Sequence, residues 1–119
     1  MALSYFITGS NLITHYVTTT GTGANDVTPE VQGRAVVIAS IEATETGGLT
    51  PNLTIDIFDP KTPATYYKRN QFAMTARQTI TYDEPFWLPQ GWQLRVTASA
   101  GVLSVLVNYF NPNATGQRS

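Results

Sequence analysis

The 119-residue chain contains no cysteine and a single histidine. The absence of cysteine excludes disulfides, thiolate metal ligands and a cysteine nucleophile. A chain of this length still buries enough surface to fold around one core without such staples. We therefore expect a single domain that folds in a reducing compartment such as a cytoplasm.

The chain is also poor in charge, since charged residues make up 13% of it and the formal net charge is -1. The one local concentration of basic side chains lies between Lys61 and Arg77, and acidic side chains stand on either side of it. Nucleic-acid binding requires a basic stripe that contacts phosphates, so we expect no nucleic-acid partner. Low charge combined with many Thr, Asn and Gln side chains suits a surface that lies against other proteins.

Long apolar runs are absent as well. The first six residues, MALSYF, lack the basic leader and apolar stretch of a signal peptide. No stretch approaches the roughly 18 apolar residues of a membrane-spanning helix. The sequence therefore predicts neither secretion nor a membrane partner.

Helical periodicity is not found, whereas short runs rich in Val, Ile, Thr, Tyr and Phe recur between Gly, Pro, Asn and Asp. This pattern predicts strands and turns. The expected strands are 5–8, 12–19, 34–44, 53–57, 65–68, 78–82, 94–98 and 103–109. Seven to eight strands at this spacing predict an all-β, single antiparallel β-sandwich over residues 1–112, of jelly-roll or immunoglobulin-like type, with a polar tail at 113–119. A β-barrel is the structural alternative.

Two local expectations follow from the residue pattern. In the longest strand the alternation places Val37, Ala39, Ile41 and Ala43 on one face, and we expect burial of both faces near its start, where Val36 and Ile38 lie on the other face. The segment Leu88 to Gly91 reads as a type I turn, because proline stands second and glycine fourth.

His15 is the only candidate for a catalytic triad or a histidine-ligated metal. It shares a strand face with Ile13 and Val17, and no Gly-x-Ser-x-Gly motif accompanies it. We therefore interpret His15 as a half-buried structural residue.

The carboxylates between residues 56 and 84 also predict no chemistry. Asp56 stands opposite the apolar face of its strand, so we expect it in solvent. Asp59 precedes Pro60 and Asp83-Glu84 precedes Pro85, which is typical of turns. No calcium-loop spacing is present, and the segment 21–23, GTG, reads as a hairpin loop because no helix follows it. We predict no catalytic residue, no bound metal and no cofactor.

Aromatic residues gather in two places, Tyr66-Tyr67 and the stretch from Phe86 to Trp92. The favoured interpretation is that one tryptophan fills the core and the other covers its end. The alternatives are a subunit interface, where Trp, Tyr and Arg concentrate, and an aromatic platform for sugars.

The final third of the chain carries a resemblance. The pattern Leu-x-x-Gly-x-x-Leu-x-Val is present as Leu88, Gly91, Leu94 and Val96, and a closing strand follows with Val105 and Val107. This stretch resembles small virion structural proteins of tailed bacteriophages, and residues 34–44 with 52–59 look like the paired core strands of the same sandwiches. Members of that family often carry an acidic residue after the turn glycine, whereas this chain has Trp92.

The resemblance implies a head decoration or cement protein, or a neck or tail component, that binds other virion proteins and catalyses nothing. The implied partners are the major capsid protein or other virion proteins together with further copies of this chain, a trimer being favoured. The implied location is the virion, after synthesis in the host cytoplasm. The segments 1–6 and 111–119 are expected to contact neighbouring subunits, so deletion of 111–119 should leave the domain folded and weaken assembly. The interface candidates are Tyr5, Phe6, Tyr66, Tyr67, Arg69, Trp87, Trp92, Phe110, Asn111 and Arg118.

Two other function classes are compatible with the pattern. A carbohydrate-binding module would use Trp87, Trp92, Tyr66 and Tyr67. A small jelly-roll enzyme would need a metal with several ligands, and the single histidine makes this the weakest of the three.

Overall fold

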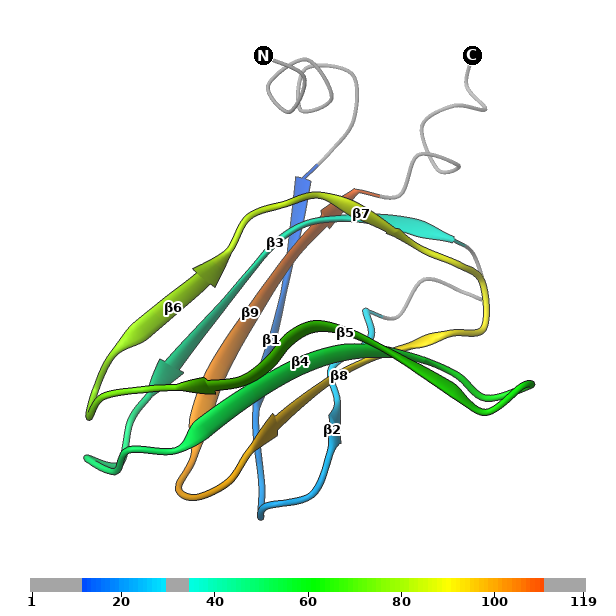
Figure 1. Cartoon of the computed structure of the whole chain (residues 1–119). Coiled ribbons are helices and arrows are strands. Elements are labelled where there is room, and N and C mark those ends of the chain that lie inside the picture. The colour runs from blue at the N-terminus through cyan, green and yellow to red at the C-terminus, as the bar shows by residue number, and fades with distance from the viewer. Residues whose placement is uncertain (1–11, 30–34, 111–119) are drawn as a thin grey trace.

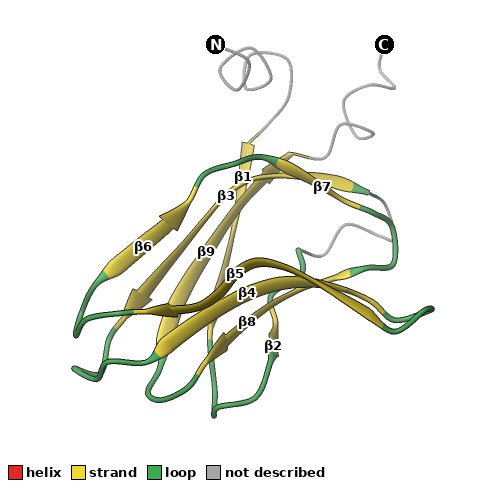
Figure 2. Ribbon diagram, viewed as in Figure 1, coloured by secondary structure: helices red, strands yellow, loops and turns green. Residues whose placement is uncertain are grey.

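The computed structural model describes residues 12–29 and 35–110, which form strands joined by loops, with no helix (Figure 2). No helix in these two segments is long and apolar enough to cross a membrane. The strands are β1 (Leu12–Thr18), β2 (Asn25–Asp26), β3 (Val36–Glu45), β4 (Asn52–Asp59), β5 (Ala64–Ala73), β6 (Thr79–Tyr82), β7 (Phe86–Leu88), β8 (Gln93–Ala98) and β9 (Leu103–Phe110).

The strands form two antiparallel sheets that lie face to face (Figure 1). Sheet A has the order β1-β9-β3-β6, and β7 also pairs with β3. Sheet B has the order β2-β8-β4-β5. The prediction of an all-β sandwich is confirmed, but the described residues form nine strands where seven to eight were expected, because β2 and β7 were not predicted.

The pairing decides between the two sandwich types. The first strand pairs with the last, β2 pairs with β8, β3 pairs with β6 and β7, and β4 pairs with its neighbour β5. These nested antiparallel pairs are those of a double-sheet jelly roll, in which one long hairpin is folded over on itself. An immunoglobulin-like sandwich would pair its strands in a different order.

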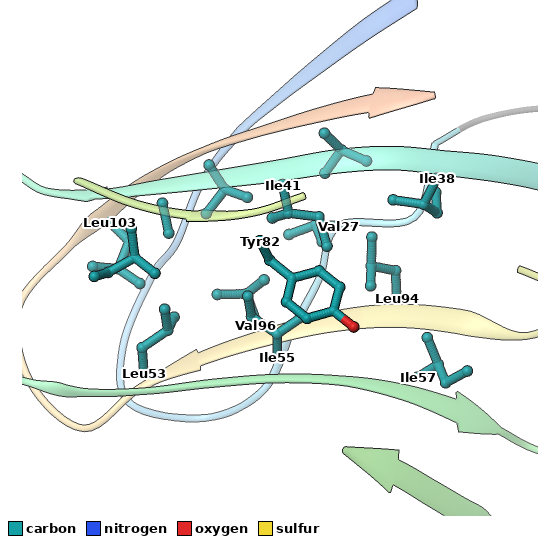
Figure 3. Packing of buried hydrophobic residues seen from close by; sticks show 14 of the residues in the cluster. Val27, Ile38, Ile41, Leu53, Ile55, Ile57, Tyr82, Leu94, Val96 and Leu103 are labelled. Atoms are coloured by element: carbon teal, nitrogen blue, oxygen red, sulfur yellow. The ribbon is translucent and has the colours of Figure 1, made fainter. Parts of the chain in front are cut away.

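Aliphatic side chains from both sheets fill the space between them, as Figure 3 shows for Ile38 and Leu103 of sheet A and Ile55 and Leu94 of sheet B. Each fully buried side chain of this size contributes about 1.5–3 kcal/mol relative to an exposed one. The alternation expected in β4, β8 and β9 is confirmed, since every second residue of these strands is buried.

The alternation expected in β3 is wrong over its first half. Val36 and Ile38 face the core, and after a register shift between Ile38 and Ser40 the inward residues are Ile41 and Ala43. A bulge adds one residue to one strand, so it reverses which parity of residues points inward. The expected burial of both faces near the start of β3 is met only in part, because Val36, Ile38 and Ala39 are buried whereas Val37, on the outer face, is half-buried.

Two turns also differ from expectation. The backbone N–H of Trp92 donates to the carbonyl of Pro89 at 3.1 Å, and Gly91 has a φ of 84°. The turn therefore spans Pro89 to Trp92 with glycine third, as a type II turn requires, instead of Leu88 to Gly91. The segment 21–23 is not a hairpin loop, because it connects β1 of sheet A to β2 of sheet B.

The remaining expected segments either differ in length from the observed strands or lie outside the described residues. The edge strand expected at 65–68 is part of the longer β5. The strand expected at 5–8, the tail at 113–119 and the domain boundary at residue 112 lie outside the described residues.

A buried carboxylate organises the loops at one end of the sandwich. Glu45, at the end of β3, is fully buried and accepts hydrogen bonds from the backbone N–H groups of Gly47, Gly48 and Arg77 at 2.8–2.9 Å. The bond from Arg77, with help from the loop N–H groups, lowers the pKa of Glu45 from 4.5 to about 2. The carboxylate of Glu45 thus connects the β3–β4 loop to the β5–β6 loop, because it accepts hydrogen bonds from both.

Candidate interaction surface

The structure separates the interface candidates. Tyr5, Phe6, Asn111 and Arg118 lie outside the described residues. Phe110 is buried at the end of β9. The remaining candidates lie on β5, on β7 and in the turn before β8, namely Tyr66, Tyr67, Arg69, Trp87 and Trp92.

Tyr66 and Trp92 form a stacked pair that closes the sandwich beside its core. Their ring centroids are 5.4 Å apart and their planes differ by 10°. Trp92 is partly buried and packs against the core cluster. The two rings cover each other, so this pair is used within the fold.

The basic residues of β5 are also used within the fold. The Nζ of Lys68 lies 4.6 Å from the ring centroid of Phe86, which belongs to β7 of the opposite sheet. The guanidinium of Arg69 lies 5.4 Å from the ring of Phe72 and 5.7 Å from that of Tyr82 on β6. Such contacts stabilise by about 0.5–2 kcal/mol each. The seam between β5 and the β6–β7 edge is therefore closed by cations over aromatic rings.

The expectation that one tryptophan fills the core is wrong. Trp87 is 58% exposed and points outward from sheet A, while Trp92 covers an end of the core. The space between the sheets is occupied mainly by Val, Ile and Leu side chains of the strands, together with the rings of Tyr82 and Tyr109.

The outer face of sheet B carries an ion pair. The Nε of Arg95 donates to Oδ1 of Asp56 at 2.8 Å, and Asp56 is only 3% exposed. The guanidinium lies 4.3 Å from the ring of Phe58, and Nη2 donates to the hydroxyl of Thr65 at 3.3 Å. The expectation that Asp56 faces solvent is wrong, because the register places Arg95 directly opposite it on β8 and Tyr67 opposite it on β5.

The outer face of sheet A combines uncharged polar groups with apolar side chains. The Thr14 hydroxyl donates to Asn108 Oδ1 at 2.7 Å, and Asn108 Nδ2 donates to the Ser40 hydroxyl at 2.9 Å, which connects β1, β9 and β3. Among the described residues of this face, Glu42 is the only charged one. The face comprises Leu12, Thr14, Tyr16, Thr18, Val37, Ser40, Glu42, Thr44, Thr79, Thr81, Trp87, Ser104, Leu106, Asn108 and the buried Phe110.

Apolar side chains form a row across one end of this face. Leu12 pairs with Phe110, Phe110 with Val37, and Val37 with Trp87, so the row crosses β1, β9, β3 and β7. The two ends of the row, Leu12 and Trp87, are exposed. Tyr16 is also exposed, and its hydroxyl lies 3.2 Å from that of Ser104. The outer face of sheet A thus combines low charge with exposed aromatic rings.

The described residues show no chemical centre. His15 is half-buried, as expected, and pairs with Val107. No group of three His, Asp or Glu side chains that could hold a metal occurs within residues 12–29 and 35–110. Asp59 accepts hydrogen bonds from the Lys61 N–H and the Thr62 hydroxyl, which is the turn predicted before Pro60.

Two residues that organise the surface were missed by sequence reasoning. Glu45 stands at a core position of β3 and reads as an ordinary strand-end charge. Arg95 alternates with buried Leu94 and Val96, so its position on the outer face is predictable from the sequence but its partner is not. Both depend on partners more than 30 residues away in sequence, and alternation within one strand carries no signal for such pairs.

Comparison with known proteins places the chain in no family. No family model matches it, and no curated protein matches its sequence. Among solved structures, it is similar to the cryo-EM structure of the extra small virus (XSV) VLP of the giant freshwater prawn Macrobrachium rosenbergii. That match has 16% sequence identity and a TM-score of 0.35, and it covers 86% of this chain and 79% of the other.

Proposed function

We propose that this chain is a non-enzymatic structural protein of a bacteriophage virion, and that it acts as a head decoration or cement protein. On this proposal the outer face of sheet A lies against the major capsid protein across junctions between capsid subunits. The protein supplies contact area, and no bond is made or broken.

The observation that carries the proposal is the composition of the outer face of sheet A. Trp87 and Tyr16 are each 58% exposed on a face where Glu42 is the only described charge. The centres of protein–protein interfaces are depleted of charged residues and enriched in Trp and Tyr. A face of this composition suits burial against another protein better than permanent exposure to water.

The fold and the sequence resemblance agree with this role. Double-sheet jelly rolls occur in viral capsid proteins, and also in lectins and cupins, so the fold alone does not distinguish a role in a virion from the roles of these other proteins. The resemblance of residues 86–110 to virion structural proteins of tailed bacteriophages favours the first of these. The segment includes β8 and β9, whose inward residues are buried as the pattern requires.

The arrangement of the aromatic residues favours a structural role over sugar binding. A sugar platform needs several rings on one surface with free faces, but Tyr66 and Trp92 stack on each other. Trp87 lies on the outer face of sheet A, and Tyr67 pairs with Asp56 on that of sheet B. The rings therefore do not form one platform.

Co-sedimentation of the purified full chain with undecorated shells of the major capsid protein from the same genome tests the proposal. We expect saturable binding with a defined number of copies per shell. Binding to isolated necks or tails and not to shells would overturn the decoration role in favour of a neck or tail component. Binding to none of these, together with binding on a glycan array, would overturn the virion role.

A further inference from the structure

Within residues 12–29 and 35–110 the two sheets have four edges, formed by β1 on one side of sheet A, by β6 and β7 on its other side, and by β2 and β5 in sheet B. An edge strand presents unpaired backbone N–H and C=O groups that recruit another strand. Proteins block such recruitment with short strands, charges, proline or bulges. The four edges of this chain differ in how far they are blocked.

Three of the edges are protected. Strand β2 has two residues, β6 has four and β7 has three, and Asp83-Glu84-Pro85 lies between β6 and β7. Strand β5 is long, but its pairing with β4 shifts register twice, and it carries Lys68 and Arg69. In addition, Gln71 of β5 has a φ of 54°, which interrupts the extended backbone.

Strand β1 has none of these protections. Its seven residues, LITHYVT, include no acidic residue, no lysine or arginine and no proline, and its register with β9 is continuous. Leu12, Ile13 and Tyr16 are exposed on it. No strand of the described segments pairs with its second edge.

We propose that β1 is a strand-addition site for a second copy of this chain. The two β1 strands pair antiparallel about a two-fold axis and join the two A sheets into one continuous sheet. The pairing is isologous, so each copy presents the same strand to the other. The proposal does not depend on the virion role, and it gives a two-fold contact where the sequence resemblance implies a trimer.

The hydrogen-bond pattern of β1 fixes which registers are open. The Thr19 N–H donates to the Leu103 carbonyl on β9 at 2.9 Å. In an antiparallel ladder the direction of the backbone groups alternates along the strand. The N–H and C=O groups of the odd residues of β1 therefore point to β9, and those of the even residues point to the open edge. A two-fold axis must therefore pair even residues with even residues.

A register centred on His15 satisfies this condition along the whole strand. Thr14 then faces Tyr16 of the second copy, and Leu12 faces Thr18. On the other side of the strand, Ile13 faces Val17, so apolar groups meet apolar groups. The strand contains no lysine, arginine or carboxylate, and His15 faces His15 of the second copy. Both outer faces of sheet A then lie on the same side of the dimer.

Because the chain has no cysteine, single-cysteine variants of the full chain test this register directly. In the proposed pair, position 15 faces itself at a non-hydrogen-bonded site, with Cα atoms about 4.5 Å apart, which is within disulfide range. His15→Cys should therefore form a disulfide-linked dimer under mild oxidation. The matched control Ile13→Cys places the two sulfurs about 13 Å apart along the strand, and it should give little dimer. Equal cross-linking of both variants, or none by His15→Cys, overturns the register.

Solution mass provides the second measurement and does not require a change at His15. The wild-type chain should be a dimer by light scattering at micromolar concentration. Thr14→Lys adds a charge to each exposed edge and should raise the dimer dissociation constant at least about tenfold. Thr81→Lys makes the same change on β6, the other edge of sheet A, and should leave the constant unchanged. A monomer at all concentrations, a trimer, or equal weakening by both variants overturns the proposal.

Discussion

The two sheets of this jelly roll place their buried carboxylates differently. Sheet A turns Glu45 inward at the end of β3, where loop N–H groups surround it, and keeps Glu42 as the only described charge on its outer face. Sheet B places Asp56 on its outer face, where Arg95 pairs with it. The Asp56 charge is thus paired on the outer surface of sheet B, whereas Asp59, the other buried carboxylate of this sheet, bonds to the turn that follows β4.

This difference shows which face is available to a partner. On sheet B, Arg95 is already engaged by Asp56, Phe58 and Thr65, so a partner would have to compete for these contacts. On sheet A, hydroxyl and amide groups bond mainly to each other and leave Trp87 and Tyr16 uncovered. Sheet A therefore offers exposed aromatic area that a partner can bury without displacing a charge.

Acid should have the largest effect, because it removes the charge of sheet A's buried carboxylate. The backbone N–H of Arg77 and the loop N–H groups lower the pKa of Glu45 to about 2, so the folded state favours the ionised form. This contribution to stability is present above pH 4.5, the ordinary pKa, and is lost as the pH falls towards 2. Urea unfolding at several pH values should show Glu45→Gln with a weaker acid dependence than the wild type. An unchanged dependence would contradict the role given to Glu45.

Breaking the ion pair on sheet B should have the next largest effect. Asp56→Ala leaves the partly buried Arg95 without its carboxylate and should lower the free energy of unfolding by about 2 kcal/mol. The matched change on sheet A, Glu42→Ala, removes a carboxylate for which the described residues show no ion pair and should cost less than about 0.5 kcal/mol. Urea titrations of both variants measure the difference. Equal losses would mean that the two outer faces do not differ in this respect.

Removal of the polar link on sheet A should have a smaller effect. Asn108→Ala breaks hydrogen bonds to Thr14 and Ser40 and should lower the free energy of unfolding by about 1 kcal/mol, because water replaces these bonds at a half-exposed site. Hydrogen exchange should show faster opening of β1 than in the wild type. A loss as large as that of Asp56→Ala would contradict the comparison.

Trp87→Ala should have the smallest effect on stability, within about 0.5 kcal/mol, because the indole is mostly exposed. Thermal unfolding of the purified variant measures this effect. A large loss of stability would show that Trp87 serves the fold and is not reserved for a partner.

Local patterns predicted the fold class and most strands because the inner faces of β4, β8 and β9 follow strict alternation. The phase of β3 was not predictable in this way, because a bulge near Ala39 leaves no mark in the residue pattern. The burial of Asp56 depends on Arg95, 39 positions later in the chain. The jelly-roll order likewise depends on pairings between distant strands, which alternation does not encode.

The candidate surface was predicted less well than the fold. Of the candidates within the described residues, Trp87 and Tyr67 are exposed on the outer faces, whereas Trp92 and Arg69 serve the sandwich seam. Aromatic composition alone does not distinguish a ring that covers the core from a ring that a partner would cover. Tyr16 was passed over because it stood on an ordinary strand.

The most direct test of the central claim compares Trp87→Ala with Tyr67→Ala in co-sedimentation with undecorated capsid shells. Both side chains are exposed to almost the same extent, 58% and 59%, on the outer faces of opposite sheets. If the outer face of sheet A binds the shell, Trp87→Ala weakens binding by about tenfold or more, as expected for an interface tryptophan, and Tyr67→Ala leaves it unchanged. Weaker binding by Tyr67→Ala with full binding by Trp87→Ala would contradict the account and assign the contact to sheet B.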